Sequence, residues 1–133
     1  MNKFVHVELN TGDTKAAKAF YKGLFDWKFE EMPGPMPYTM LDTGAKDAAG
    51  GITQKPMAEA PTQWLAYVEV ASVKKTIAKA KAKGAQIVVE YMPIPGMGAL
   101  GIFIDPTGAS LGVWESEPKK KPAKKPAKKA KKK

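Results

Sequence analysis

The 133-residue chain carries a net charge of +9 and no cysteine, which excludes disulfide bonds and thiolate metal sites. Its length suits one domain with a sizeable core. No apolar run is long enough to cross a bilayer, and the first residues do not form a charged segment followed by an apolar one. We therefore expect a cytoplasmic protein with no membrane partner.

The positive charge is confined to the end of the chain. Residues 1–118 contain 12 lysines and 13 acidic residues, whereas residues 119–133 contain ten lysines and no acid. The chain has no arginine. The first 118 residues are thus almost neutral, and any binding driven by positive charge is expected to belong to the last 15 residues.

The first half of the sequence begins with a predicted strand, FVHVELN at residues 4–10. Its alternation places Val5, Val7 and Leu9 toward the core, beneath the helix that follows, and His6 and Glu8 on the opposite face. The segment TGDTKAAKAFYKGLF predicts that helix, with Asp13 or Thr14 as its N-cap. Three short strands are then expected at residues 27–31, 37–42 and 48–54.

The second half repeats this plan. A strand at 64–70 precedes a helix that Ser72 can cap and Gly84 can end, with Val73 and Ile77 facing inward. Strands are predicted at 86–90, 99–104 and 109–114. A shift of 61 residues aligns Val7-Glu8-Leu9 with Val68-Glu69-Val70, Gly23 with Gly84, and Gly51-Ile52 with Gly112-Val113. The sequence therefore predicts two copies of a β-α-β-β-β module.

This duplicated module resembles the vicinal oxygen chelate superfamily, which includes glyoxalase I, extradiol dioxygenases and bleomycin- and fosfomycin-resistance proteins. The matching segments are TGDTKAAKAFYKGLFDWKF and PIPGMGALGIFIDPTGASLGVWES. The resemblance implies an α+β fold in which module one (1–57) and module two (62–117) form a cupped, mixed β-sheet barrel around a central cleft. A disordered tail at 118–133 would follow. Because the superfamily hosts lyases, isomerases, dioxygenases and metal-free binders, the resemblance indicates the fold and not the reaction.

In metal-using members of the superfamily, four ligands lie on the first and last strands of the two modules. His6 matches the first ligand position, but the two carboxylate positions fall on Gly51 and Gly112, and the remaining one falls on Leu65 or Tyr67. A single imidazole does not retain a divalent ion, so we expect a ligand-depleted member of the superfamily with no metal or other cofactor. A shifted site built from His6, Glu8 and Glu69 is the alternative.

Without a metal site, the cleft is predicted to bind a small molecule through apolar walls and a few polar groups. Met97, in the Pro/Gly loop 92–98, could act as a lid. The predicted ligand-binding residues are His6, Glu8, Tyr38, Met40, Gly51, Trp64, Tyr67, Met97, Gly112 and Trp114.

A metal-free enzyme in this cleft would need general acid–base chemistry. The candidate catalytic residues are His6, Glu8, Glu69 and Tyr67. The sequence favours a ligand-binding or sequestering protein. A glyoxalase- or dioxygenase-like lyase or oxidoreductase is the alternative. Whether the modules pair within one chain or between two is left open, and a homodimer is one of the arrangements considered.

The last residues, KKKPAKKPAKKAKKK, resemble the C-terminal arms of linker histones and of some bacterial nucleoid proteins. They contain no large apolar side chain, so they cannot fold by burial. Flexible lysines bind polyanions by releasing counterions from phosphates, without reading sequence. We expect non-specific attachment to DNA, RNA or another polyanion, of which the bacterial nucleoid is one candidate. Nucleic-acid binding as the main function is a second alternative. The residues predicted to bind are Lys119, Lys120, Lys121, Lys124, Lys125, Lys128, Lys129, Lys131, Lys132 and Lys133.

Overall fold

The computed structural model describes residues 1–33, 37–46 and 49–117, and these form one curved, open sheet of eight strands with two helices. The elements are β1 (Phe4–Thr11), α1 (Thr14–Lys22), β2 (Lys28–Met32), β3 (Tyr38–Asp42), β4 (Ala49–Gln54), β5 (Gln63–Glu69), α2 (Val73–Ala82), β6 (Gln86–Ile94), β7 (Gly98–Ile104) and β8 (Ser110–Ser116). The ten predicted lysine contacts and the predicted disorder of residues 118–133 lie outside the described residues. Within the described residues, neither helix is long and apolar enough to span a membrane.

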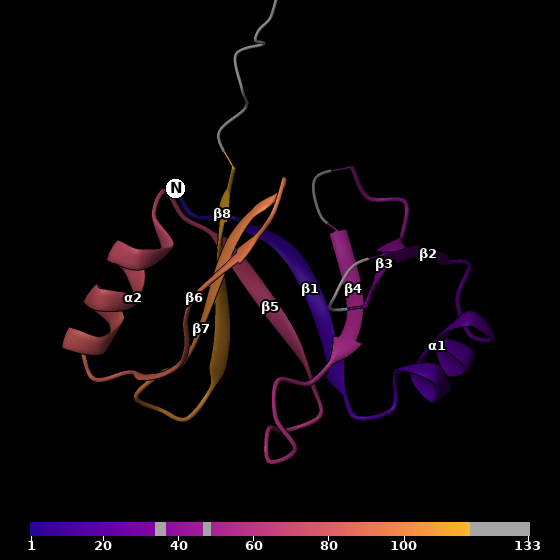
Figure 1. The fold of residues 1–133 in the computed structure, drawn as a ribbon, viewed down its shortest axis with the longest axis horizontal. Helices are drawn as coiled ribbons and strands as arrows, with labels where there is room; N and C mark the ends of the chain where they lie inside the picture. Colours follow the sequence, from indigo (N-terminus) through magenta and orange to yellow (C-terminus); the bar gives the residue numbers. More distant parts are fainter. Residues whose placement is uncertain (34–36, 47–48, 118–133) are drawn as a thin grey trace, which may run out of the picture.

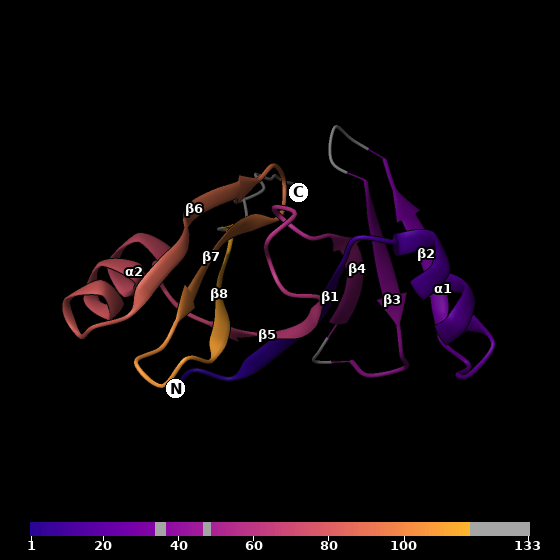
Figure 2. The same cartoon turned by 90° about the horizontal axis from the view of Figure 1, so that it is seen from below.

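The predicted α+β fold with two β-α-β-β-β modules is confirmed. The strand order is β2-β3-β4-β1-β5-β8-β7-β6. In each module the first strand pairs in parallel with the last, β1 with β4 and β5 with β8. The modules join through the antiparallel pair β1–β5 of the same chain. Figure 1 and Figure 2 show the two helices at opposite outer ends of the molecule, with the curved sheet between them.

Both helices begin at the residues that their sequences indicate. Asp13, one of the two predicted N-caps of α1, accepts a hydrogen bond from the backbone nitrogen of Ala16 at 3.0 Å. Ser72 caps α2 by accepting one from Lys75 at 3.2 Å. Gly84 follows α2 at a positive φ of 102°. These caps satisfy backbone groups that have no partner inside the helix and so fix where the helices start and end.

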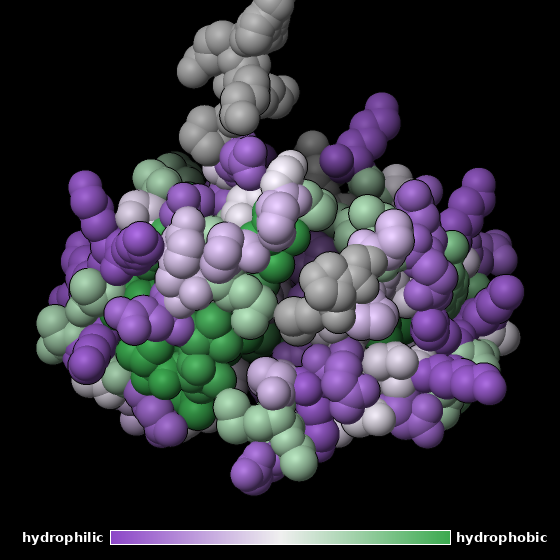
Figure 3. Space-filling view, in the orientation of Figure 1, coloured by the Kyte–Doolittle hydropathy of each residue, from purple (hydrophilic) through white to green (hydrophobic). Residues whose placement is uncertain are grey.

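The apolar core consists of three clusters. Under α1, the buried residues are Leu9, Leu41 and Ile52. Under α2, they are Val73, Ile77 and Val113. The third cluster contains Leu65, Tyr67 and Ile102, with Leu100 and Trp114 packed against it, and it fills the inner face of module two. In Figure 3, hydrophilic side chains border the outside of the molecule near both helices, and hydrophobic surface lies over the strands beside α2.

The prediction that Val7 belongs to the core is wrong. Leu9 is buried as expected, but Val7 is 42% exposed. The nine-residue helix α1 contacts β4 and packs against the core cluster that contains Leu9, and it leaves the strand face at Val7 uncovered. Val7 instead borders a shallow hollow on the outer face, together with Gly50 and Trp64.

Candidate functional site

A hydrogen-bonded cluster surrounds the carboxylate of Glu8 at the seam between the modules. Glu8 lies on β1 and is only 6% exposed. It accepts hydrogen bonds from the Tyr38 hydroxyl of β3 at 2.9 Å, the Tyr67 hydroxyl of β5 at 3.1 Å and the Asn10 side-chain amide at 2.8 Å. His6 joins the group through a 2.6 Å contact between its Nε2 and the Tyr38 oxygen. We call these five residues the Glu8 cluster.

The pattern of donors in the Glu8 cluster defines the state of the imidazole. The single proton of the Tyr38 hydroxyl is donated to the Glu8 carboxylate. The Tyr38 oxygen must therefore accept the bond from His6, so Nε2 of His6 carries a proton. Glu8 orients Tyr38, and Tyr38 in turn orients His6.

Burial shifts the protonation equilibria of the cluster. It lowers the pKa of His6, an effect that the negative charge of Glu8 opposes in part. Burial raises the pKa of both Tyr38 and Tyr67 well above the ordinary range of a phenol. The negative charge of Glu8 is the second cause and acts in the same direction. The two hydroxyls therefore remain protonated donors at any pH at which the protein is expected to be folded.

Two glycines make room for the two tyrosines. A Cβ atom added at Gly51 would overlap the hydroxyl and ring of Tyr38, and one added at Gly112 would overlap the ring of Tyr67. Gly51 is the strand neighbour of Glu8, and Gly112 is the strand neighbour of Tyr67. The tyrosine rings thus occupy the space that side chains at these two positions would need.

The residues present do not fit the metal ion that the superfamily resemblance implies. Two of the four ligand positions carry side chains that already have partners: Nε2 of His6 contacts the Tyr38 oxygen, and Tyr67 donates its hydroxyl to Glu8. The two carboxylate positions are Gly51 and Gly112, which have no side chain to bind an ion. The alternative third position, Leu65, is buried in the apolar core of module two.

The alternative site from His6, Glu8 and Glu69 does not assemble either. Three donors already engage the carboxylate of Glu8, and Glu69 lies at the end of β5 beside Trp114. In the parts of the chain that the structure describes, no group of three or more histidine or acidic side chains could hold an ion.

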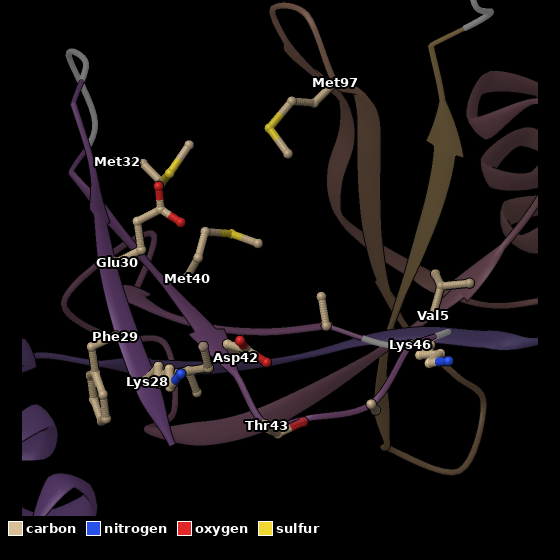
Figure 4. A pocket seen from close by; sticks show the side chains of 13 residues that line it. Val5, Lys28, Phe29, Glu30, Met32, Met40, Asp42, Thr43, Lys46 and Met97 are labelled. Atoms are coloured by element: carbon tan, nitrogen blue, oxygen red, sulfur yellow. The ribbon is translucent and has the colours of Figure 1, made fainter. Parts of the chain in front are cut away.

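A cavity of about 650 Å³ lies beside the cluster, on the module-one side of the cleft (Figure 4). Its upper walls carry thioethers from Met32 of β2, Met40 of β3 and Met97 of the β6–β7 loop. The remaining lining residues are Val5, Lys28, Phe29, Glu30, Leu41, Asp42, Thr43, Ala45, Lys46 and Ala49. The volume lies within the range of small-molecule sites, about 300–1,000 Å³.

The cavity is in module one because the equivalent space in module two is filled. There, Leu65, Tyr67 and Ile102 form a packed cluster with Leu100 and Trp114. The pseudo-symmetry of the backbone is therefore not matched by the side chains. Module two has a packed cluster in this region, and module one has an open cavity.

The structure divides the predicted ligand-binding residues into separate groups. Met40 and Met97 line the cavity, whereas His6, Glu8, Tyr38 and Tyr67 are in the Glu8 cluster. Gly51 and Gly112 accommodate the tyrosine rings, and Trp114 packs against the core of module two.

The placement of Trp64 in the cleft is wrong. Its indole lies on the outer face of the sheet, where it donates to the Tyr21 hydroxyl at 3.2 Å and packs edge-on against Trp27. Side chains alternate along a strand, so Trp64 and Tyr67, three residues apart, point to opposite faces. The three-residue spacing of Trp64 and Tyr67 in the sequence therefore already indicated that they lie on opposite faces of the strand.

The sequence analysis missed Lys28, Glu30 and Met32, which line the cavity from β2. Their spacing of two residues places them on one face of the strand, opposite Phe29 of the core. The alternation alone could have indicated a shared face. It could not show that the face borders a cavity, which depends on the pairing of β2 with β3.

Comparison with known proteins agrees with the two-module fold. The Glyoxalase/Bleomycin resistance protein/Dioxygenase superfamily matches residues 3–113. The chain belongs to this superfamily. Among curated relatives, the CFP32 protein of Mycobacterium bovis, which is named as a glyoxylase, is 31% identical over 115 residues, covering 83% of this chain and 44% of the relative. The anthracycline biosynthesis protein DnrV of Streptomyces peucetius is 26% identical over 125 residues, covering 80% of this chain and 44% of the relative. The chain thus spans less than half the length of these curated relatives.

Solved structures show the same fold. The hypothetical protein BH1468 of Bacillus halodurans has a TM-score of 0.64 at 16% identity, covering 96% of this chain and 99% of that one. The methylmalonyl-CoA epimerase of Mycobacterium tuberculosis has a TM-score of 0.62 at 13% identity, covering 86% and 88%. At these identities the likeness shows the fold alone.

Proposed function

We propose that this glyoxalase-superfamily chain binds a small molecule in the cavity lined by Met32, Met40 and Met97, without a metal ion. The observation that carries the proposal is an open cavity next to a space that tyrosine rings fill, at the position where the resemblance implies a metal ion. The cavity measures about 650 Å³. Beside it, Tyr38 and Tyr67 fill the space next to Gly51 and Gly112 and donate to Glu8.

Binding has more support than catalysis. The candidate acid–base residues His6, Glu8 and Tyr67 satisfy one another's hydrogen bonds, and none of them is among the residues that line the cavity. Glu69, the fourth candidate, does not line it either. A general base must come within hydrogen-bond reach of the proton that it removes. A glyoxalase- or dioxygenase-like enzyme would therefore require the Glu8 cluster to open.

The relatives are compatible with small-molecule binding. One of them is named for anthracycline biosynthesis, and a solved structure with the same fold is a methylmalonyl-CoA epimerase in complex with methylmalonyl-CoA. Both names concern small organic molecules of different classes. They support a ligand-binding cleft in this chain, and they do not select its ligand.

The ten lysines of residues 119–133 support a second part of the proposal, a tether. Residues 1–117 would form the ligand-binding domain, and the terminal segment would attach it to DNA, RNA or another polyanion, such as the bacterial nucleoid, without sequence preference. The first 118 residues have 12 lysines and 13 acidic residues, which argues against the domain itself as the main nucleic-acid binder. A homodimer and a cytoplasmic location remain predictions.

A thermal-shift screen of apolar and aromatic small molecules, run with and without divalent metals, tests the proposal. Ligands that raise the melting temperature of the full chain should do so equally in the presence of a chelator. Met40→Trp, which places an indole in the cavity, should abolish the shift. Hits that depend on added metal, or that Met40→Trp leaves unchanged, would contradict the proposal.

A further inference from the structure

Glu30 places a negative charge between the thioethers of the cavity. It lies on β2 directly opposite Met40 of β3, and Met32 is the next residue on the same face. Figure 4 shows its carboxylate projecting into the cavity beside the side chains of Met32 and Met40. A charge in this position is close to any molecule that contacts both methionines.

Within the described residues, no ion pair or hydrogen bond engages the carboxylate of Glu30. The neighbouring Glu31, which points to the other face of β2, is held by Lys18 at 3.0 Å and by the Thr39 hydroxyl at 2.9 Å. Lys28 and Asp42, which also line the cavity, are direct cross-strand partners and place opposite charges side by side. Glu30 faces Met40 across the strand pair instead, and among the described residues no salt bridge joins it to Lys28 or Lys46, the two lysines that line the cavity.

The walls around Glu30 suit a flat aromatic body. Thioethers are flexible and polarizable, and they make favourable contacts with aromatic rings. Three of them, from Met32, Met40 and Met97, come from separate segments of the chain and converge on one space. Met97 belongs to the loop between β6 and β7 and so brings module two to the mouth of the module-one cavity.

We propose that the cavity selects an aromatic ligand with a cationic group, whose ring lies between the methionines and whose positive charge pairs with Glu30. This inference rests on the proposed function, since it names the class of ligand for the same cavity. It involves no covalent step.

Three probes that share a ring system and differ in charge test the inference: 1-pyrenemethylamine, 1-pyrenemethanol and 1-pyrenecarboxylate. Each is titrated by fluorescence into the full chain and into Glu30→Gln, Glu59→Gln and Met40→Trp. Glu59 is an exposed loop residue outside the cavity and serves as the matched control. The lysine-rich segment is present in every protein, so its attraction for the anionic probe cancels between variants.

We expect the cationic probe to bind most tightly. Glu30→Gln should weaken its binding by about three- to fivefold, as expected for a partly exposed ion pair, and added salt should reduce the difference. The neutral probe should change by less than about twofold in both glutamine variants, within the range of a surface substitution.

The outcomes separate the two proposals. If the neutral probe binds and Met40→Trp blocks it, but Glu30→Gln leaves the cationic probe unaffected, the cationic class is wrong and the cavity function stands. If Met40→Trp changes the binding of no probe, both proposals fail. Equal losses for all three probes in Glu30→Gln would show that the variant distorts the cavity, and the charge pairing would be rejected.

Discussion

The hydroxyl of Tyr38 occupies the position at which a side chain on Gly51 would begin. This relationship links the sequence to the chemistry of the site, because Gly51 stands where the superfamily resemblance implies a carboxylate ligand. Gly112 and Tyr67 repeat the arrangement in the second module. The two glycine–tyrosine pairs, with Glu8 between them, form a hydrogen-bonded joint at positions to which the superfamily resemblance assigns metal ligands.

The first prediction concerns the pairing of Gly51 with Tyr38. Gly51→Ala should destabilise the protein by about 1–3 kcal/mol, because the added methyl group overpacks a filled site. In a Tyr38→Ala background the same substitution should cost less than half as much, since the ring that it overlaps is absent. Urea denaturation of the four proteins in this cycle gives the coupling energy.

Gly12→Ala is the control for this cycle. A Cβ at Gly12 would be 3.6 Å from the nearest atom, Cε of Lys55, which is ordinary contact. It should change the free energy of unfolding by less than about 1 kcal/mol. Equal costs of Gly51→Ala in both backgrounds would show that Tyr38 does not fill the space beside Gly51.

The second prediction concerns the buried carboxylate. Glu8→Gln should lower the free energy of unfolding by about 1–3 kcal/mol, because an amide cannot accept the three hydrogen bonds now made by Tyr38, Tyr67 and Asn10. Glu59→Gln, on an exposed loop, should have no measurable effect. Chemical denaturation provides the comparison, and a Glu8→Gln variant as stable as the wild type would contradict the hydrogen-bonded cluster.

The sequence alone led to a different expectation for Glu8, as a ligand-binding residue of the cleft and not as a buried acceptor of three hydrogen bonds. Alternation along FVHVELN correctly separated Glu8 from Leu9. The burial of Glu8 depends on Tyr38, which follows 30 residues later and reaches it only through the pairing of β3 with β4 and of β4 with β1. A long-range contact of this kind leaves no periodic signal in the sequence.

Other features were predictable because their causes are local. Asp13 and Ser72 cap helices through residues three positions away, and the eight strands follow alternation and Pro/Gly punctuation. The aromatic residues were harder to assign. Trp64 packs outside the sheet and Trp114 inside it, and composition does not distinguish these two environments.

The third prediction uses the lowered pKa of His6. The unfolded chain takes up a proton at His6 near the ordinary pKa of 6.5, before the folded protein does. Stability contributed by the neutral imidazole is therefore present above this pH and is lost as the pH falls through it toward the folded pKa. The fall in melting temperature between about pH 7.5 and pH 5.5 should be smaller in His6→Asn. An unchanged fall would mean that His6 does not contribute to it.

The fourth prediction concerns residues 119–133. The logarithm of the affinity for duplex DNA should fall linearly with the logarithm of salt concentration, with a slope between about −4 and −9 if half to all of the ten lysines bind phosphate. Electrophoretic or anisotropy assays at several salt concentrations measure the slope. Binding should not depend on DNA sequence.

Removal of residues 119–133 provides the control. The shortened chain should lose DNA binding and keep the melting temperature of the full chain, because the domain core lies within residues 1–117. Full DNA affinity in the shortened chain, or a sequence preference above about tenfold, would assign nucleic-acid recognition to the folded domain.

The most direct test of metal-free ligand binding is a fluorescence titration of 1-pyrenemethanol into the full chain, before and after exhaustive treatment with a chelator and then with added Zn²⁺, Mn²⁺ or Ni²⁺. Because Tyr38 and Tyr67 occupy the space beside Gly51 and Gly112, the dissociation constant should be the same in all conditions, and Met40→Trp should eliminate binding. Binding that disappears with the chelator and returns with one of these metals would contradict the account.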